Sequence, residues 1–430
     1  MPTLAVVTIA KDESAWIGAC LDSVRTIADD IVVGDTGSSD DTKAIAMGRG
    51  ARAIDVPWND DFAAARNAVL RAATADWLLH LDADETLDAE GARAVRALVD
   101  ADGHGADAIE VTLANYCNDV RAWRWTPVAP DDPSARGKAG YIAVPLLRLF
   151  RNRRGFEYRE PVHENITESV IEQGGAVRAE HGIVIHHHGF GKGGNEKAEF
   201  YLRIARTKTE SRPDDPKAWH DLGEQLVALG RPEEAGPAVR RALELDPAHA
   251  GAATTLANIL LNRGELDAAR AVLEAFADAG FPHVLVALAA IACKQGRVGD
   301  ADAQIARAVT IAPRHVLARL TAARIADVRG LPKAAFMQLE AARAFAPGVA
   351  EVAARIDAMR LRDEADALIQ QGDAKAALAL LVAALKHDPE DPLIHLRLAT
   401  VLERLGDAPR AAASRARAFS LAPGLEGGGS

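Results

Sequence analysis

The sequence predicts two kinds of structure in succession, an α/β domain with a mostly parallel sheet and then an all-α solenoid. Short β-branched runs alternate with helical stretches up to about Gly194. From about Asp214 onward the strand-like runs vanish, alanine and leucine dominate, and a glycine and a proline recur at regular spacing. We therefore expect a domain over 1–194, a connecting helix over 195–213, a solenoid over 214–425 and a flexible tail over 426–430.

The α/β prediction depends on four short apolar strands separated by helices. The expected strands are Leu4–Ile9, Ile31–Val33, Ala53–Val56 and Trp77–Leu81, and the expected helices are Trp16–Ile27, Asp41–Met47, Phe62–Ala73 and Leu87–Val99. Strands separated in this way indicate βαβ crossovers and hence parallel pairing. Beyond residue 108 the pattern coarsens into the strand-like pieces Ala108–Leu113, Leu146–Phe150 and Ile183–Ile185, joined by loops long enough to suggest function.

The solenoid prediction depends on six glycines, each followed by a proline 17 or 18 residues later. The pairs are Gly230 and Pro247, Gly264 and Pro282, Gly296 and Pro313, Gly330 and Pro347, Gly372 and Pro389, and Gly406 and Pro423. Successive glycines lie 34, 32, 34, 42 and 34 residues apart. A period of about 34 residues of paired helices resembles tetratricopeptide (TPR) repeats, and six such units would stack into a curved array. We expect each glycine at the junction of two helices and each proline after the second helix, and the 42-residue interval predicts a longer helix or an insertion.

Composition excludes several classes of protein. The chain has 430 residues, 49% of them hydrophobic and 26% charged, as in ordinary globular proteins. A formal net charge of −11 argues against non-specific binding to nucleic acids or anionic membranes. The three cysteines lie far apart, which disfavours a disulfide framework and a structural zinc site. No targeting segment and no apolar run of about 20 residues is found, so we expect a soluble, cytoplasmic protein without a transmembrane segment.

A carboxylate and a glycine turn follow the second predicted strand, in Asp35-Thr36-Gly37-Ser38. The carboxyl end of a parallel strand lies in the crevice where α/β folds bind ligands. Asp35 could accept hydrogen bonds from a nucleobase or a ribose hydroxyl, or it could belong only to a strand-to-helix turn. The absence of a GxGxxG pattern disfavours a dinucleotide-binding fold.

Two aspartates separated by one residue, Asp82 and Asp84, follow the fourth predicted strand in Asp82-Ala83-Asp84-Glu85. Carboxylates in this arrangement can converge on one hard divalent ion, Mg²⁺ or Mn²⁺, which is typically shared with the diphosphate of a substrate. The alternative is an acidic turn that caps the following helix.

These motifs together resemble family 2 glycosyltransferases of the GT-A fold, most closely a bacterial subset. The resemblance covers roughly residues 1 to 195, and the matching segments are 35–40, 58–67, 82–85, 148–152, 162–164 and 185–190.

The resemblance implies a role for each matching residue. Thr8, Ile9 and Ala10 would line the pocket for the nucleobase and ribose together with Asp35. Arg66 would contact the nucleotide or its phosphates, since a planar cation suits phosphate oxygens; a salt bridge to the neighbouring acidic loop is its alternative. Asp82 would face the ribose or the sugar, and Asp84 would bind the metal.

Glycosyl transfer also needs a proton acceptor. The resemblance favours Glu164 as the general base with His163 second, and it implies inversion at the anomeric carbon; alternatively, Glu164 only holds a loop. Alternation along the strand sends His187 to the face opposite His186 and His188. His187 is therefore a candidate for a further metal or diphosphate contact, or a structural histidine. The arginines near residue 148 could hold a diphosphate or an acidic acceptor, although such clusters more often form a solvated face.

The two regions together predict an inverting, metal-dependent glycosyltransferase with Mn²⁺ or Mg²⁺ as cofactor. The donor would be a nucleotide sugar, expected to be a UDP-sugar, and the acceptor a peptide or protein docked by the TPR repeats, which could instead form a homodimer. One alternative is transfer to a lipopolysaccharide core or another saccharide. Another is a non-catalytic TPR scaffold with a degenerate nucleotide-binding domain, against which the intact Asp35, Asp82, Asp84 and Glu164 speak.

Overall fold

The structure is a computed structural model that describes all residues except 123–124, 153, 162–163, 190–194 and 426–430. The chain divides into two compact units. The N-terminal unit comprises Met1–Asn118, Arg124–Thr126 and Pro133–Gly194, and the C-terminal unit comprises Asp119–Trp123, Pro127–Asp132 and Asn195–Ser430. Among the residues that the structure describes, no helix combines the length and apolarity needed to cross a membrane.

The first half of the N-terminal unit is a parallel sheet, as predicted. Its strands run in the order β3-β2-β1-β4 and are all parallel. The strands are β1 (Leu4–Ala10), β2 (Asp30–Asp35), β3 (Arg52–Asp55) and β4 (Trp77–His80), and the helices between them are α1 (Ile17–Val24), α2 (Thr42–Gly48) and α3 (Phe62–Ala72). Successive residues of β1 enter different cores, because Leu4 and Val6 pack with α1 whereas Ala5 and Val7 pack with α3. Helices therefore cover both faces of the sheet.

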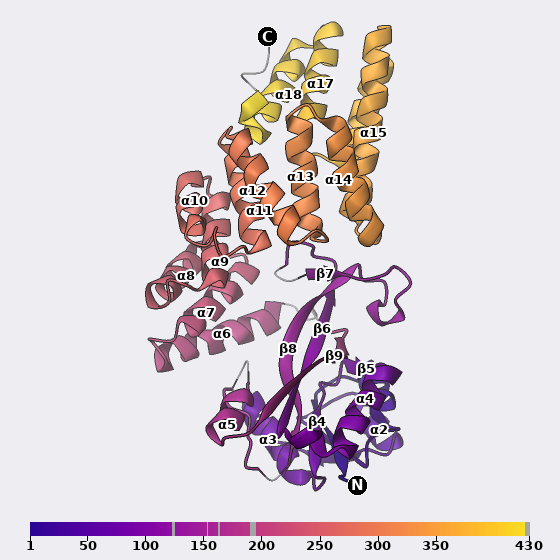
Figure 1. The fold of residues 1–430 in the computed structure, drawn as a ribbon, viewed down its shortest axis with the longest axis vertical. Coiled ribbons are helices and arrows are strands. Elements are labelled where there is room, and N and C mark those ends of the chain that lie inside the picture. The colour runs from indigo at the N-terminus through magenta and orange to yellow at the C-terminus, as the bar shows by residue number, and fades with distance from the viewer. Residues whose placement is uncertain (123–124, 153, 162–163, 190–194, 426–430) are drawn as a thin grey trace. The chain divides into compact units, whose positions relative to one another are not determined.

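The second half of the N-terminal unit makes the sheet a mixed one. Strand β8 pairs antiparallel with β4 and β6, β9 pairs parallel with β6, and β5 pairs antiparallel with β9. The elements, seen in Figure 1, are β5 (Glu85–Leu87), α4 (Ala89–Asp100), β6 (Ala108–Cys117), β7 (Trp125–Pro127), β8 (Gly140–Arg151), α5 (Thr167–Glu172) and β9 (Val177–His187).

Three of these strands are longer than the sequence predicted, and the short strands β5 and β7 were missed. Strand β6 continues to Cys117 because Asn115, Tyr116 and Cys117 pair in register with β8. Strand β5 has only three residues, and its pairing with residues 185–187 of β9 forms it within an acidic stretch that has no strand pattern of its own. Helix α4 accordingly begins at Ala89, where Asp88 caps it by accepting a hydrogen bond from the Gly91 amide.

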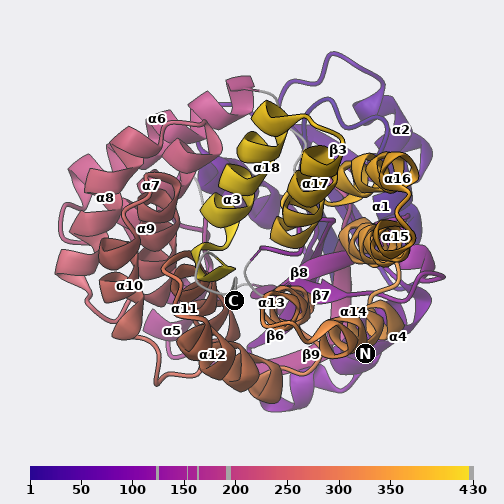
Figure 2. The same cartoon turned by 90° about the horizontal axis from the view of Figure 1, so that it is seen from above.

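The C-terminal unit contains helix α6 (Asn195–Ser211) followed by six antiparallel helical hairpins within the described residues 216–421. The hairpins are α7 (Pro216–Ala228) with α8 (Pro232–Leu245), α9 (Ala250–Asn262) with α10 (Leu266–Glu274), α11 (Pro282–Lys294) with α12 (Val298–Ile311), α13 (Val316–Val328) with α14 (Pro332–Phe345), α15 (Ala350–Gln371) with α16 (Ala374–His387), and α17 (Pro392–Arg404) with α18 (Ala408–Leu421). In Figure 2 these helices follow one another around a curve. The predicted solenoid is confirmed.

The recurring glycines and prolines take nearly the places that were expected. All six junction glycines have positive φ, from 70° at Gly230 to 86° at Gly372, which explains the choice of glycine there. Five of the six prolines lie two residues beyond the second helix of a hairpin, but Pro282 is the first residue of α11. The prediction was therefore wrong for Pro282, because proline is equally suited to the first turn of a helix. The 42-residue interval corresponds to the 22-residue helix α15.

Candidate functional site

The predicted nucleotide-binding residues lie where β1 and β2 end. Ala10 and Asp35 are register partners at the carboxyl ends of these parallel strands. Asp35 is almost buried, and its Oδ1 accepts hydrogen bonds from the amide (3.1 Å) and the hydroxyl (2.5 Å) of Ser38, so it also shapes the turn after β2. Thr8 and Ile9 line a small pocket that Arg66 shares. The structure thus brings Thr8, Ile9 and Arg66 together and places Ala10 beside Asp35.

Arg66 is a buried cation that joins two carboxylates from distant parts of the chain. It projects from α3, whose first turn is fixed by Asp61 accepting a hydrogen bond from the Ala64 amide. Its Nη1 lies 2.7 Å from Asp82 Oδ1, and its Nε donates to Glu164 Oε1 over 2.7 Å. The side chain of Arg66 is only 8% exposed. A salt bridge is therefore present, but its partners lie 16 and 98 residues away and not only in a neighbouring acidic loop. It occupies two carboxylates to which the sequence had assigned other roles.

A second buried arginine, Arg148 on β8, holds the same aspartate from another direction. Its Nη2 donates to Glu85 Oε1 over 2.8 Å and lies 3.5 Å from Asp82 Oδ2. Glu85 in turn accepts the Asp82 amide proton through Oε2 over 2.8 Å. Arg148 therefore belongs to the interior of the site, unlike the solvated face that such arginine clusters usually form.

His80 and Tyr158 fill the space between the two arginines. His80 Nδ1 lies 2.6 Å from the Tyr158 hydroxyl and 2.9 Å from Arg148 Nη1, and its Nε2 contacts Arg66. Burial, reinforced by the charges of Arg66 and Arg148, lowers the pKa of His80 well below its usual value of 6.5. His80 is thus a neutral spacer beside two cations.

The two arginines also set the charge on the carboxylates that they contact. Loss of solvation by itself would raise the pKa of Asp82, but the charges of Arg66 and Arg148 outweigh it and hold that pKa well below 3.8. Burial raises the pKa of Glu85 to about 7, against the opposing charge of Arg148. Asp82 therefore stays ionised through the neutral pH range, whereas Glu85 titrates within it.

Asp84 faces a different partner from Asp82. Its Oδ2 lies 3.4 Å from Nε2 of His187, at the end of β9. His187 Nδ1 lies 2.6 Å from Oδ1 of Asn115, so Nδ1 carries the proton and Nε2 is directed toward Asp84. Burial acts to lower the pKa of His187, but the hydrogen bond to Asp84 and the charges of the nearby carboxylates raise it above 6.5.

Gly189 allows this arrangement because it has no side chain. A Cβ atom at position 189 would lie 1.4 Å from Asp84 Oδ2, a distance at which the two atoms overlap. The two histidines that flank His187 point to the other face of β9. His186 contacts the Tyr116 hydroxyl (2.8 Å), and His188 stacks on Trp16. The predicted alternation along this histidine run is confirmed.

The sequence predicted some of the residues of this site and missed others. It named Arg66, Asp82, Asp84, Glu164 and His187, and the structure brings these together as Arg66–Asp82–Glu164 and Asp84–His187. His163 lies outside the described residues. The buried residues to which the sequence gave no role are His80, Glu85, Asn115 and Tyr158, and Arg148 was considered only as one of a group of arginines that could hold a diphosphate or an acidic acceptor. A polar residue within an apolar strand, such as His80 in Trp-Leu-Leu-His-Leu, was the available signal.

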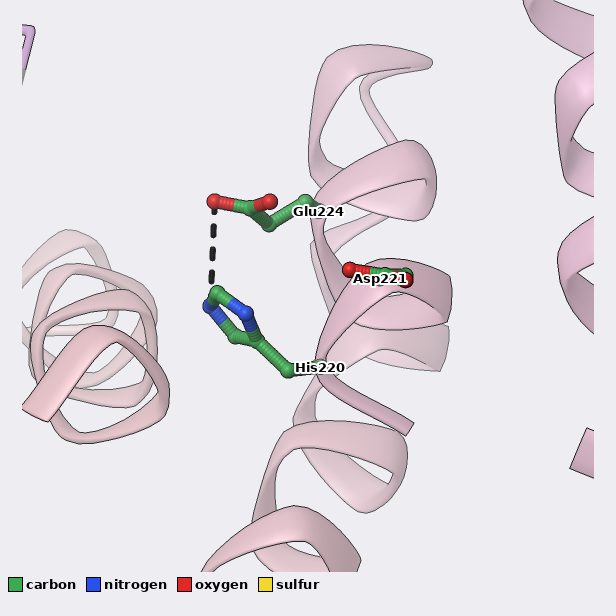
Figure 3. Close-up of side chains that lie close together, drawn as sticks. All are labelled: His220, Asp221 and Glu224. Atoms are coloured by element: carbon green, nitrogen blue, oxygen red, sulfur yellow. Dashed lines mark ion pairs between the residues drawn. The ribbon is translucent and has the colours of Figure 1, made fainter. Parts of the chain in front are cut away.

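A second group of metal-ligand types lies on α7 in the C-terminal unit. Figure 3 shows His220, Asp221 and Glu224, with Nε2 of His220 lying 3.7 Å from Oε1 of Glu224. The Asp221 carboxylate is already bound by Lys217 (2.7 Å) and Lys208 (3.2 Å). A divalent cation there would meet two ammonium groups, so we assign no metal site to this group.

Both regions of the chain resemble known proteins. Residues 5–173 match the profile of glycosyl transferase family 2, and residues 192–250, 226–279 and 368–417 match tetratricopeptide repeat profiles. A TPR repeat-containing protein of Synechococcus elongatus is 32% identical over 238 residues, which cover 54% of this chain and 54% of the relative. The SPbeta prophage-derived glycosyltransferase SunS of Bacillus subtilis is 24% identical over 252 residues, 54% of this chain and 51% of SunS.

A solved structure, the glucosyl-3-phosphoglycerate synthase of Mycobacterium tuberculosis, is 17% identical with a TM-score of 0.34 and covers 47% of this chain and 78% of its own. The chain spans about half the length of the two curated relatives described above. On these matches, the chain carries a glycosyl transferase family 2 domain followed by tetratricopeptide repeats.

Proposed function

We propose that this chain is an inverting, metal-dependent glycosyltransferase that moves a sugar from a nucleotide-sugar donor to a peptide or protein acceptor. The observation that carries the proposal is the pairing of Asp84 with His187, two residues from Asp82, which is itself held by two buried arginines. This arrangement supports the proposal because a carboxylate and an imidazole, which are groups able to bind a cation, lie near buried arginines at the end of β4. We take 1–194 as the transferase domain, 195–213 as the connecting helix and 214–425 as the repeats.

The donor would enter where β1, β2 and β4 end. Asp35 would accept hydrogen bonds from the base or ribose through Oδ2, since Oδ1 is used by Ser38. Thr8, Ile9 and Ala10 would form the floor of this subsite. Arg66 would contact the phosphates, and Asp82 would accept a hydrogen bond from a hydroxyl of the ribose or sugar, for which its low pKa suits it.

The residues at the Asp84 site fit a divalent ion. A carboxylate and an imidazole are ligands that Mn²⁺ accepts, and the hydrogen bond from His187 to Asn115 orients Nε2 toward Asp84. When bound, Mn²⁺ or Mg²⁺ would neutralise the charge that develops on the departing nucleoside diphosphate. A UDP-sugar is the donor that we propose to test first.

Glu164 would act as the general base. Its carboxylate would take the proton of an acceptor hydroxyl or thiol while that oxygen or sulfur forms a bond to the anomeric carbon. The bond from that carbon to the phosphate oxygen breaks on the opposite side, which inverts the configuration. Arg66 would have to release Glu164 for this step, and a donor diphosphate offers Arg66 an alternative partner.

The TPR repeats would hold the acceptor. Arrays of helical hairpins present extended concave surfaces that bind polypeptides. Association of two chains through the same repeats is the alternative use, which light scattering of the purified protein would reveal. A saccharide acceptor would make the repeats unnecessary for transfer.

Donor hydrolysis tests the proposal directly. The purified chain is mixed with UDP-sugars and Mn²⁺, and release of the nucleoside diphosphate is measured with and without chelator. We expect turnover that chelator and Asp84→Ala abolish. A chain that ends at residue 213 should keep slow hydrolysis and lose modification of a protein acceptor. Absence of turnover and of binding with every donor would instead favour a non-catalytic scaffold.

A further inference from the structure

Strand β8 contains one residue more than its partner β6 at the point where Arg148 lies. Leu149 is the register partner of Ile109, and Leu147 is that of Glu110, the next residue of β6. Arg148 therefore has no partner in this ladder. Packing shows the same shift, because Leu147 and Leu149 enter different hydrophobic cores, whereas residues two apart in a regular strand share a face. Arg148 thus lies at a β-bulge, an irregularity that often redirects a side chain beside an active site.

The buried side chain of Arg148 reaches residue 82 by two routes. Directly, its Nη2 lies 3.5 Å from Oδ2 of Asp82. Indirectly, Nη2 donates to Oε1 of Glu85 over 2.8 Å, and Oε2 of Glu85 accepts the hydrogen bond of the Asp82 amide over 2.8 Å. The Glu85 amide donates in turn to the Asp82 carbonyl oxygen over 3.0 Å and closes the turn. Arg148 therefore fixes both the carboxylate and the backbone of Asp82.

The two carboxylate oxygens of Asp82 face different arginines. Oδ1 lies 2.7 Å from Nη1 of Arg66, whereas Oδ2 faces Arg148. Arg66 borders the small pocket at the end of β1, where the donor would enter. Arg148 is held inside the sheet by Glu85 and by His80, whose Nδ1 lies 2.9 Å from Nη1 of Arg148. The arginine on the donor side can therefore change partner while the other one stays beside Asp82.

This division matters when a diphosphate binds Arg66. Oδ1 of Asp82 then becomes available to a hydroxyl group of the ribose or sugar, and the charge of Asp82 is still balanced at Oδ2. Without Arg148, the same carboxylate would keep no arginine partner once Arg66 has moved. Leaving a carboxylate of an interior ion-pair network without its cation is costly, so donor binding would be weaker.

We infer that Arg148 is a positioning residue that holds Asp82 and balances its charge while Arg66 binds the donor. The inference rests on the proposed function. It gives Arg148 a role through Asp82, in place of the direct contact with a diphosphate or an acidic acceptor that the sequence allowed.

Nucleotide affinity distinguishes action through Asp82 from contact with the donor. Calorimetry with Mn²⁺ first identifies which of UDP, GDP and ADP the unaltered full-length chain binds. Its affinity is then measured for Arg148→Met, for Asp82→Asn and for the double variant. We expect Arg148→Met to weaken binding about tenfold in the unaltered chain, an ordinary size for coupling within one ion-pair network. In the Asp82→Asn chain the same substitution should change affinity less than about twofold, because no charge is left there to balance.

Two further variants separate lost charge from lost structure. Arg148→Lys keeps the positive charge and should bind the nucleotide within about threefold of the unaltered chain. Arg96→Met is the matched control, because Arg96 on α4 also forms ion pairs, with Asp29 (3.0 Å) and Asp100 (2.7 Å). Asp29 directly precedes β2, at the opposite end of that strand from Asp35, so this control should not change nucleotide affinity. If circular dichroism shows that Arg148→Met does not fold, Arg148→Gln replaces it in the comparison.

Three results would overturn the inference. Equal weakening by Arg148→Met with and without the Asp82 charge would mean that Arg148 contacts the nucleotide itself. No weakening in the unaltered chain would mean that Asp82 needs no second cation, and a lysine variant as weak as the methionine variant would exclude charge as the cause. The unaltered chain tests the proposed function separately. If it binds a nucleotide and the variants show no coupling, only the role of Arg148 is wrong, whereas binding of none of the three nucleotides would refute the proposed function and the inference with it.

Discussion

Arg66 donates a hydrogen bond from Nε to Oε1 of Glu164 over 2.7 Å, joining two residues that lie 98 positions apart in the sequence. The same guanidinium lies 2.7 Å from Asp82 through Nη1. One cation thus balances both the proposed general base and the proposed sugar-facing carboxylate. A ligand that binds Arg66 in place of these carboxylates would remove the positive charge between them. Donor binding would therefore change the electrostatic environment of Glu164.

We expect Arg66→Met to destabilise the N-terminal unit strongly. The substitution keeps an apolar stem of similar length but leaves Glu164 without the charge that compensates it, and leaves Asp82 with Arg148 alone, 3.5 Å away. Removing one member of a buried ion pair costs about 3–5 kcal/mol. Urea unfolding monitored by tryptophan fluorescence should show this loss. A change below about 1 kcal/mol would mean that the carboxylates find other partners.

Glu164→Gln should separate stability from catalysis. Glutamine keeps an oxygen that can accept from Arg66, so we expect the unfolding midpoint to change little. Glutamine cannot accept the acceptor's proton, so transfer should fall by about 10²–10⁴-fold, the usual contribution of a general base. Affinity for the donor, measured by calorimetry, serves as the control. Full transfer activity would exclude Glu164 as the base.

Gly189→Ala should displace the Asp84 carboxylate while leaving Asp84 itself unchanged. The added methyl group would lie 1.4 Å from the present position of Oδ2, so the carboxylate must turn away from His187. Misplacement of a reacting group by about 1 Å can cost 10²-fold in rate. We expect a loss of about this size in Mn²⁺-dependent donor hydrolysis. Gly105→Ala, where a Cβ would meet no atom within 4 Å although φ is positive, shows how much loss comes from instability alone.

The sequence predicted the parts of the fold that depend on local pattern. Strands β1 to β4 and helices α1 to α3 follow from apolar periodicity, and the hairpins follow from the glycine and proline spacing. Strand β5 could not be predicted, because three residues carry no period and the strand exists only through its pairing with β9. The early start of β8 has a similar cause, since its first residues form a strand by pairing with the end of β6.

Site residues that belong to a sequence motif could be predicted. Site residues whose role depends on burial beside distant partners could not. Asp84 and His187 were assigned together by motif and alternation, and they lie 3.4 Å apart. Arg148 resembled one of several surface arginines, because nothing local shows that Glu85 and Asp82 surround it. The role of the Arg148 charge can be inferred only from the folded structure, in which partners more than sixty residues away in sequence lie beside it.

A buried ion pair within the repeats offers a test of what holds them together. Arg362 on α15 forms a two-pronged contact with Asp327 on α13, and its Nη1 lies 3.2 Å from Asp391. Arg362→Met alone should cost about 3–5 kcal/mol, because it removes the arginine that pairs with the buried Asp327, whereas Asp391 keeps Arg324 at 3.6 Å. Adding Asp327→Leu should recover part of that loss in urea unfolding. If the double variant is less stable than the single one, Asp327 stabilises the repeats by contacts other than its ion pair with Arg362.

The stability of the repeats should fall as the pH is lowered from neutral toward 5. Burial, with the neighbouring His249, lowers the pKa of His220 to about 4, and burial, with His315, does the same for His283. Both histidines bind a proton more readily in the unfolded chain, with a pKa near 6.5, than in the folded one. The unfolded state therefore gains protons first as the pH falls, and the stability present above pH 6.5 is lost between about 6.5 and 4. At pH 5 each histidine should account for about 1–2 kcal/mol. Thermal unfolding followed by circular dichroism at pH 7.5 and pH 5 should show a smaller drop for His220→Gln than for the unaltered chain. The exposed His387→Gln should leave the drop unchanged, and an equal drop in all three proteins would assign the acid sensitivity to carboxylates instead.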